Sequence, residues 1–160
     1  MPTFFDTHNP SILAIPVFHI LSVLPHSYAL FVASPNGVST WDNRNPRSTT
    51  LRSKLQDKLD PERFAYYERL KACHANGMEN LPLFATAVIL GNLGGLGRGT
   101  MTRFAAAIIA IRLAYTATYA TTNTQGPTVI RSGLWVVQVA LCFRTLIKAA
   151  KALGGGRVGY

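Results

Sequence analysis

Four long runs rich in apolar residues constrain the fold of this chain more than any other feature. The first, residues 11–33, contains no Lys, Arg, Asp or Glu, and further runs follow at about 62–93, 101–122 and 128–150. A helix rises by about 1.5 Å per residue, so each run is long enough to cross a bilayer hydrocarbon core of about 30 Å. We therefore predict an all-α fold: an integral membrane, multi-pass, four-helix bundle.

A buried four-helix protein that is soluble in water is the alternative fold. Its helices would each need a charged face turned to solvent, and the runs at 11–33 and 128–150 have almost none. Pro16 and Pro25 lie inside the first run, and proline is better tolerated in membrane helices than in soluble ones. Both features favour the membrane fold.

The remaining segments connect these runs within a single domain of residues 1–160. In the polar loop 34–61, leucines recur every fourth residue, which is compatible with a short amphipathic surface helix: Leu51, Leu55 and Leu59. Asp60 and Pro61 form a typical N-cap and first helical position. The glycine-rich tail, 151–160, is expected to be flexible.

The basic charge of the chain comes from a shortage of acids. The formal net charge is +9, yet only 14% of residues are charged, against about 25% in ordinary globular proteins. The bases lie mainly between the apolar runs and at the C-terminus, as the flanking charges of membrane segments do, and form no stripe interleaved with aromatics. Membrane lipid, not nucleic acid, is therefore the expected partner.

The sequence indicates no metal site. Cys73 and Cys142 lack the spacing of metal ligands and fit small, buried apolar side chains. His19 and His26 share a helix face, but no further ligands accompany them.

Polar side chains inside the second run are the first candidates for a functional site. A charged group at the bilayer centre costs about 2.5–3.5 kcal/mol on insertion scales, and such groups usually face a cavity or the bundle interior. At about 100° per residue, one helix face carries a base, two amides and a carboxylate: Arg69, Asn76, Glu79 and Asn80. A purely structural network of hydrogen bonds between helices is the alternative interpretation.

A second polar face lies on the third run. Arg112, Tyr115 and Tyr119 are spaced by three and four residues, so they share one side of the helix. Arg112 needs an anionic partner, either a ligand carboxylate or Glu79 in a buried structural pair. Together the two faces offer acceptors for an amine and donors for carboxylates, which suits a small zwitterionic peptide.

Two segments then resemble the signatures of a known family, the membrane-associated proteins of eicosanoid and glutathione metabolism (MAPEG). ERLKACHANGMENLPLF is similar to the second-helix signature, with matching residues at His74, Asn76, Glu79, Pro82 and Phe84. RLAYTATY is similar to the third-helix signature Arg-x-x-Tyr-x-x-x-Tyr, and NPR ahead of the second run resembles the first loop. Chain length and the order of the four runs agree as well.

The resemblance implies a homotrimer of four-helix protomers in the endoplasmic reticulum or another intracellular membrane. It implies glutathione as co-substrate, bound between adjacent protomers, and a transferase or peroxidase that acts on a small lipophilic substrate. The expected glutathione-binding residues are Arg69, Asn76, Glu79, Arg112, Tyr115 and Tyr119.

Two departures from the family pattern leave catalysis open. Ala72 stands where the enzymes commonly carry an arginine, and residues 120–130 contain none of the bases expected near the thiol. The attacking species is a thiolate, which a nearby cation or hydroxyl donor must stabilise. Tyr115, Tyr119 and Arg131 are the remaining catalytic candidates. A non-enzymatic family member, whose buried polar residues stabilise a trimer, is the alternative.

The orientation in the membrane stays open, as do the organelle and the lipophilic substrate. The basic first loop belongs in the cytosol by the positive-inside rule, with both termini opposite. Arg98, Arg103 and the basic tail argue for the reverse.

Overall fold

The computed structural model describes residues 7–34, 37, 41, 44–122 and 128–155 of the chain. Over these ranges the secondary structure comprises five helices and no strand. The helices are α2 (Pro10–Ala33), α3 (Thr49–Lys58), α4 (Pro61–Leu93), α5 (Arg98–Thr121) and α6 (Thr128–Gly155). The prediction of an all-α fold is confirmed.

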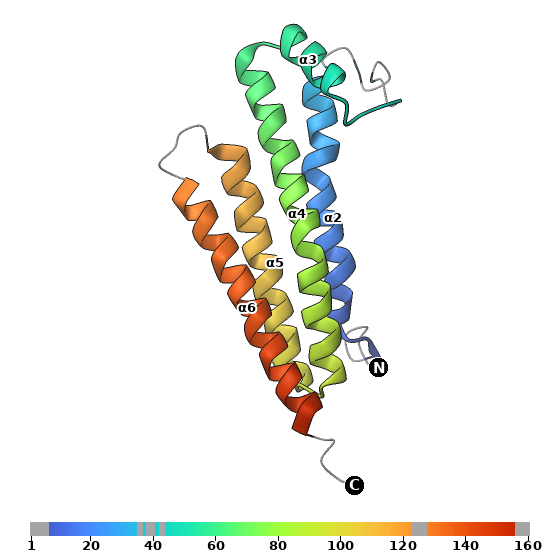
Figure 1. Cartoon of the computed structure of the whole chain (residues 1–160), viewed down its shortest axis with the longest axis vertical. Coiled ribbons are helices and arrows are strands. Elements are labelled where there is room, and N and C mark those ends of the chain that lie inside the picture. Colours follow the sequence, from blue (N-terminus) through green and yellow to red (C-terminus); the bar gives the residue numbers. More distant parts are fainter. Residues whose placement is uncertain (1–6, 35–36, 38–40, 42–43, 123–127, 156–160) are drawn as a thin grey trace.

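The four long helices lie alongside one another, and the short α3 covers one end (Figure 1). α2 packs chiefly against α4, while α5 contacts α2, α4 and α6. The turn between α4 and α5 lies at the end opposite α3, together with the start of α2 and the end of α6 (Figure 1).

Short polar residues followed by proline determine where two of the long helices begin. The side chain of Asn9 accepts a hydrogen bond from the Ser11 N–H, and Asp60 accepts one from the Arg63 N–H at 2.9 Å. Each bond satisfies an amide that has no partner within the helix. The predicted N-cap at Asp60 is confirmed.

The short helix that the leucine spacing allows is present, and the last long helix is longer than predicted. A helix, α3, occupies part of the polar loop 34–61, with Leu55 and Leu59 buried against the bundle. α6 continues to Gly155, whereas a helix end near residue 150 was predicted. Lys, Ala and Leu favour helix, so α6 persists until paired glycines weaken it. The rest of the predicted flexible tail, 156–160, lies outside the described residues.

Two apolar clusters hold the bundle together. In the larger one, the rings of Phe18 on α2 and Phe84 on α4 lie 5.1 Å apart, with Ile108 of α5 and Cys142 of α6 packed around them. The smaller cluster joins α3 to α2 and α4 near Tyr67. All four long helices are therefore fixed to a common core.

The outer surface of the bundle is also apolar. Phe31, Val129 and Ile147 are 66%, 73% and 69% exposed. Among the described residues, three helices are long and apolar enough to cross a membrane: α2, α5 and α6. α4 is not among them, because its polar residues lower its mean hydropathy. Soluble monomers rarely expose so much apolar surface, so the structure supports membrane insertion of these three helices.

Candidate functional site

The guanidinium of Arg112 lies inside the bundle, where only 1% of the residue is exposed. Its Nη2 donates to the Cys73 carbonyl at 2.8 Å, and its Nη1 donates to Asn76 Oδ1 at 3.4 Å. Its Cζ lies 5.6 Å from the ring centroid of Phe18 and 5.2 Å from that of Tyr115. A carbonyl, an amide and two aromatic faces thus compensate for the desolvation of this cation.

Gly77 makes room for this arrangement. A Cβ at position 77 would collide with Nη2 of Arg112 and with the side chain of Ser22. Ser22 is itself fixed, because its hydroxyl donates to the Phe18 carbonyl at 2.8 Å. The sequence analysis did not identify Gly77, although a glycine inside a helix is a signal of close approach.

Arg112 and Glu79 form no ion pair, so the buried structural pair considered from the sequence is wrong. Glu79 is exposed and faces away from the bundle interior. An ion pair does join Arg52 of α3 to Glu68 of α4, at 2.8 Å. Arg112 is instead held by uncharged groups, and its Nε has no hydrogen-bond partner.

A cavity of about 450 Å³ lies between α4, α5 and α6, and we call it the tyrosine pocket. Its lining consists of Asn76, Tyr115, Tyr119, Arg131, Ser132, Trp135 and Val136. The Cζ of Arg131 lies 4.1 Å from the centre of the Tyr119 ring, and the rings of Tyr115 and Tyr119 are 5.2 Å apart. Arg112 lies behind Tyr115, so two cations flank the tyrosine pair.

Arg131 reaches this pocket because α6 runs antiparallel to α5. The first turn of α6 lies beside the last turns of α5, where Tyr119 is found. From the sequence, residues 120–130 contain no base, and Arg131 is the nearest base downstream of Tyr119. The packing of the two helices brings its guanidinium onto the Tyr119 ring nonetheless.

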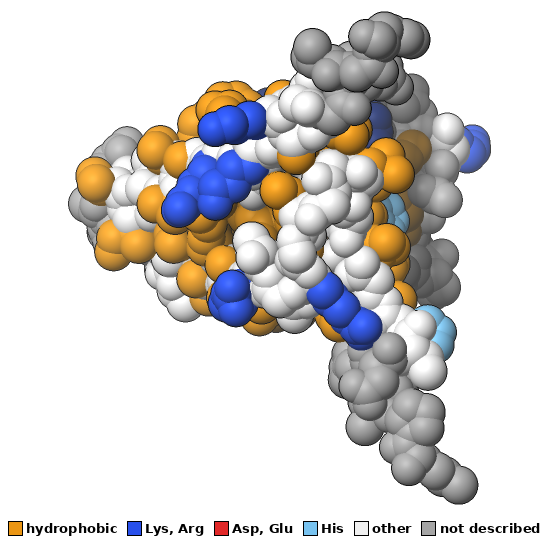
Figure 2. Space-filling model, turned by 90° about the horizontal axis from the view of Figure 1, so that it is seen from below, with side chains coloured by type: hydrophobic (Ala, Val, Ile, Leu, Met, Phe, Trp, Pro, Cys, Tyr) orange, Lys and Arg blue, Asp and Glu red, His pale blue; other side chains and the backbone are white. Residues whose placement is uncertain are grey.

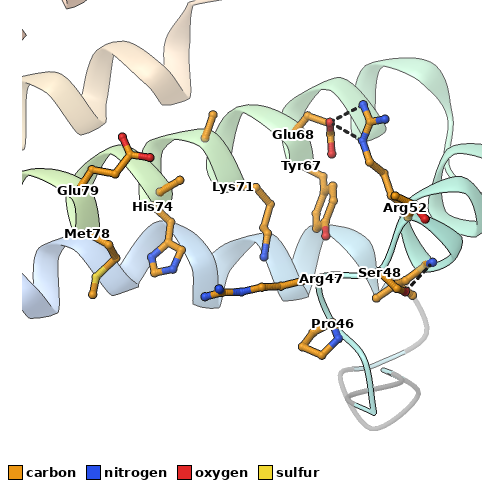
Figure 3. A pocket seen from close by; sticks show the side chains of 14 residues that line it. Pro46, Arg47, Ser48, Arg52, Tyr67, Glu68, Lys71, His74, Met78 and Glu79 are labelled. Atoms are coloured by element: carbon orange, nitrogen blue, oxygen red, sulfur yellow. Dashed lines mark hydrogen bonds and ion pairs between the residues drawn. The ribbon is translucent and has the colours of Figure 1, made fainter.

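Glu79 lines a different cavity, a groove of about 630 Å³ between α4 and residues 46–52, which we call the basic groove (Figure 3). Lys71 donates to Nδ1 of His26 at 3.2 Å, and Nδ1 of His74 donates to the Ser22 carbonyl at 2.9 Å. In Figure 3, Lys71 and His74 point to one side of α4 and Glu79 points to the other.

Arg69 lies in a third cavity, near α3. Its Cζ is 5.3 Å from the ring centroid of Tyr66, and its Nε is buried without a hydrogen-bond partner. Tyr28 and the N-terminal turn of α4 complete this lining. Arg69 and Glu79 share a helix face but lie about 15 Å apart along the axis, at 1.5 Å per residue.

One protomer therefore brings together five of the predicted residues and separates two. Gathered around the tyrosine pocket are Asn76, Arg112, Tyr115, Tyr119 and Arg131. Glu79 and Arg69 lie in the two other cavities. The exposed aromatic at the pocket, Trp135, was not singled out for this role from the sequence.

The chemistry of the tyrosine pocket favours an anion. A guanidinium, an amide and two phenol hydroxyls supply hydrogen-bond donors of the kind that bind a carboxylate or a thiolate. Glu79 offers an acceptor for an ammonium group. No group of three or more His, Cys, Asp or Glu side chains in the described part of the chain is arranged to hold a metal ion.

Comparison with known proteins gives one match. Residues 12–151 match the model of the MAPEG family. No curated protein and no solved structure matches the chain significantly. The matched range extends from the first turn of α2 into the last turns of α6, and it includes every residue of the tyrosine pocket.

Proposed function

The chain belongs to the MAPEG family, and from this membership we propose that it binds glutathione and uses the thiol to attack lipophilic substrates. The family and the three apolar helices make it an integral membrane protein. We also propose that α4 crosses the membrane, which gives a bundle of four membrane helices, and that three copies assemble. The expected location is the endoplasmic reticulum or another intracellular membrane.

The observation that carries this proposal is the position of Arg131 over Tyr119, beside Tyr115 and Asn76. The sequence lacks a base in residues 120–130, where the family pattern expects one near the thiol. Arg131 supplies a cation at the tyrosine pair from α6 instead. A cation beside a thiol favours the thiolate, which is the reactive nucleophile.

The residues present fit the groups of glutathione, which carries two carboxylates, one ammonium group, two amides and a thiol. Asn76, Tyr115 and Tyr119 suit the peptide and sulfur groups, and Glu79 suits the ammonium group. Arg69, which lies in the third cavity, is proposed to bind one of the two glutathione carboxylates. Glu79 faces away from the pocket of its own protomer, which supports a ligand held between neighbouring copies.

The position of the pocket suits a substrate dissolved in lipid. Trp135 and Val136 line it and are 42% and 55% exposed, so an apolar molecule can approach from the bilayer side. In the transferase reaction, the thiol proton leaves to water, the thiolate sulfur forms a bond to an electrophilic carbon, and the bond from that carbon to a leaving group such as a halide breaks, with its electron pair departing on the halide. In the peroxidase reaction, two glutathione molecules are oxidised to the disulfide while a lipid hydroperoxide is reduced to an alcohol and water.

The test is a binding and activity assay on the detergent-purified protein. We expect millimolar glutathione to raise the midpoint of thermal unfolding, and a chromogenic electrophile to be conjugated. Glu79→Gln should weaken binding by tenfold or more, roughly the loss of one charged contact. Lys54→Gln, an exposed change on α3, is the matched control and should bind normally. Unchanged binding in Glu79→Gln would exclude this site.

A non-enzymatic role remains the second candidate, and one observation favours it. Arg112 directs its hydrogen bonds to Cys73 and Asn76 of its own chain, as a structural residue does. Ala72 also replaces the family's arginine. If wild-type protein shows neither conjugation nor a thermal shift with glutathione, the role of the polar residues is structural: they stabilise the assembly and do not bind glutathione.

A further inference from the structure

We propose that the end of the bundle opposite α3 carries a binding site for an anionic phospholipid. A cavity of about 250 Å³ opens there between α5 and α6. Three cations line it, Arg103 from α5 and Arg144 and Lys148 from α6. This site is distinct from the tyrosine pocket, which lies toward the other end of the same two helices.

The three cations are available to a ligand. Each is exposed, and none forms a hydrogen bond or an ion pair with another described residue. They belong to two different helices, so their convergence results from the packing of α5 against α6. Such a cluster repels itself unless an anion binds to it.

No described acid lies at this end to neutralise the cluster. Every Asp and Glu of the described residues falls in α3, at the N-cap of α4 or within α4: Asp57, Asp60, Glu62, Glu68 and Glu79. Figure 2 shows this end of the molecule, with Lys and Arg side chains on its surface and no Asp or Glu in view. Within the described ranges, the cluster therefore has no carboxylate partner, and an anionic ligand would neutralise it.

The depth of the cluster places it at the lipid headgroups. Arg103 lies in the second turn of α5, and Lys148 lies about 10 Å along the axis from the end of α6 at Gly155, at 1.5 Å per residue. Both helices are membrane-span candidates, so these positions fall near one boundary of the hydrocarbon core. Basic side chains at this level interact favourably with anionic lipids.

The rest of the cavity is apolar, which favours a lipid over a free phosphate. Met101, Phe104 and Leu141 form its walls. Phe143 and Ile147, beside it on α6, are 53% and 69% exposed. A cavity of this size holds a headgroup or a few methylene groups, and the acyl chains would continue along these exposed side chains. The cations bind the phosphate, and the apolar surface binds the chains.

Native mass spectrometry of the full-length protein tests this proposal. The protein in neutral detergent is mixed with equal amounts of phosphatidylglycerol and phosphatidylcholine, and the lipids that it retains are counted. We expect wild type to retain phosphatidylglycerol in roughly tenfold excess or more, given three cations. The triple variant Arg103→Gln, Arg144→Gln, Lys148→Gln should retain the two lipids within about twofold of each other.

A matched control removes three exposed cations at the other end: Lys54→Gln, Lys58→Gln and Arg63→Gln. It lowers the net charge equally and should keep the preference of wild type. If the first triple variant does not fold, the single variant Arg144→Gln should still lower the preference severalfold, while Arg144→Lys should preserve it.

Three results would overturn the proposal. The first is a wild-type protein without a preference for phosphatidylglycerol. The second is stabilisation by millimolar inorganic phosphate alone that equals the effect of the lipid, which would assign the site to a free anion. The third is a loss of oligomeric mass in the triple variant, which would assign the cavity to contact with a second copy. None of these measurements involves glutathione, so their outcome is independent of the proposed function.

Discussion

Arg131 is the residue on which the proposed chemistry depends most. Replacing it with Met removes the cation over Tyr119 and keeps most of the apolar stem. We expect the conjugation rate at neutral pH to fall by tenfold or more, with the pH–rate profile moved to higher pH by about one unit. The direction follows from charge: without a cation the thiolate is less stable, so the pKa of the bound thiol rises. Rates measured between pH 6 and 9 check this.

Arg131→Lys provides the control for that experiment. It keeps the positive charge but not the planar stacking on Tyr119, so most of the pH profile should be retained. A profile in Arg131→Met identical to that of wild type would remove Arg131 from the mechanism.

A second prediction about a single residue concerns Gly77 and the stability of the protein. In Gly77→Ala the new methyl group collides with Arg112 and Ser22, and both of these residues are buried. We expect the free energy of unfolding to fall by about 1–3 kcal/mol, as for other overpacked sites. Gly133→Ala on α6 is the matched control, because a Cβ there meets nothing within 4 Å. It should leave the thermal midpoint in detergent unchanged or raise it. Equal effects of both substitutions would contradict this account.

Individual residues show where reasoning from the sequence stops. Arg112, Tyr115 and Tyr119 were predicted to share a face, and the structure places them in a row, because their spacing is local to one helix. Arg69 and Glu79 also share a helix face, yet they line separate cavities. Two residues can have similar angles around the helix axis and still lie far apart along it. The approach of Arg131 depends on how α6 packs, which no local pattern specifies.

At the scale of elements, a polar network fastens the start of α2 to the end of α4. Asn9 donates to Asn92 Oδ1 at 2.7 Å, Asn92 donates to Ser11 Oγ at 3.0 Å, and Ser11 Oγ donates to Asn9 Oδ1 at 2.8 Å. Ser11 is fully buried. Each member thus satisfies the next in a closed cycle, at the end of the bundle that α3 does not cover.

The network should behave as one unit. We expect Asn92→Ala to lower the free energy of unfolding by about 1–3 kcal/mol, because the half-buried Asn9 Nδ2 loses its acceptor and the buried Ser11 Oγ loses one of its donors. Ser11→Ala should cost a similar amount, and the double variant should cost clearly less than the sum. Denaturation of wild type, the two single variants and the double variant in detergent measures the coupling free energy between Asn92 and Ser11. Additive effects would show that the two side chains act independently.

The helices themselves were more predictable than their contacts. Long apolar runs have few alternatives to helix in a membrane, because every backbone amide must find a partner within the segment. The sequence therefore located all four long helices, while their ends shifted by a few residues. α4 is not among the helices apolar enough to cross a membrane, and its polar residues include Asn76 of the tyrosine pocket and Glu79.

At the scale of the whole molecule, the exposed surface is not uniform. α2 and α6 expose large apolar side chains, as helices that face lipid do. α4 instead exposes Ala72, Ala75 and Glu79 along one side. A carboxylate facing lipid at mid-helix is costly, and small side chains permit close approach of another helix. This face of α4 is therefore the one that a second copy of the chain would cover.

The last prediction follows from that asymmetry. Native mass spectrometry of the purified protein should give a mass three times that of the 17.4 kDa chain. In Ala75→Trp, a large ring replaces the small side chain at the proposed contact, and we expect the trimer to dissociate into smaller species. Val129→Trp adds the same ring to an exposed position on α6, the face proposed to meet lipid, and should leave the trimer intact. A trimer that survives Ala75→Trp, or a wild-type monomer, would move the subunit contact away from α4 and leave Glu79 without the neighbouring copy that the proposed glutathione site requires.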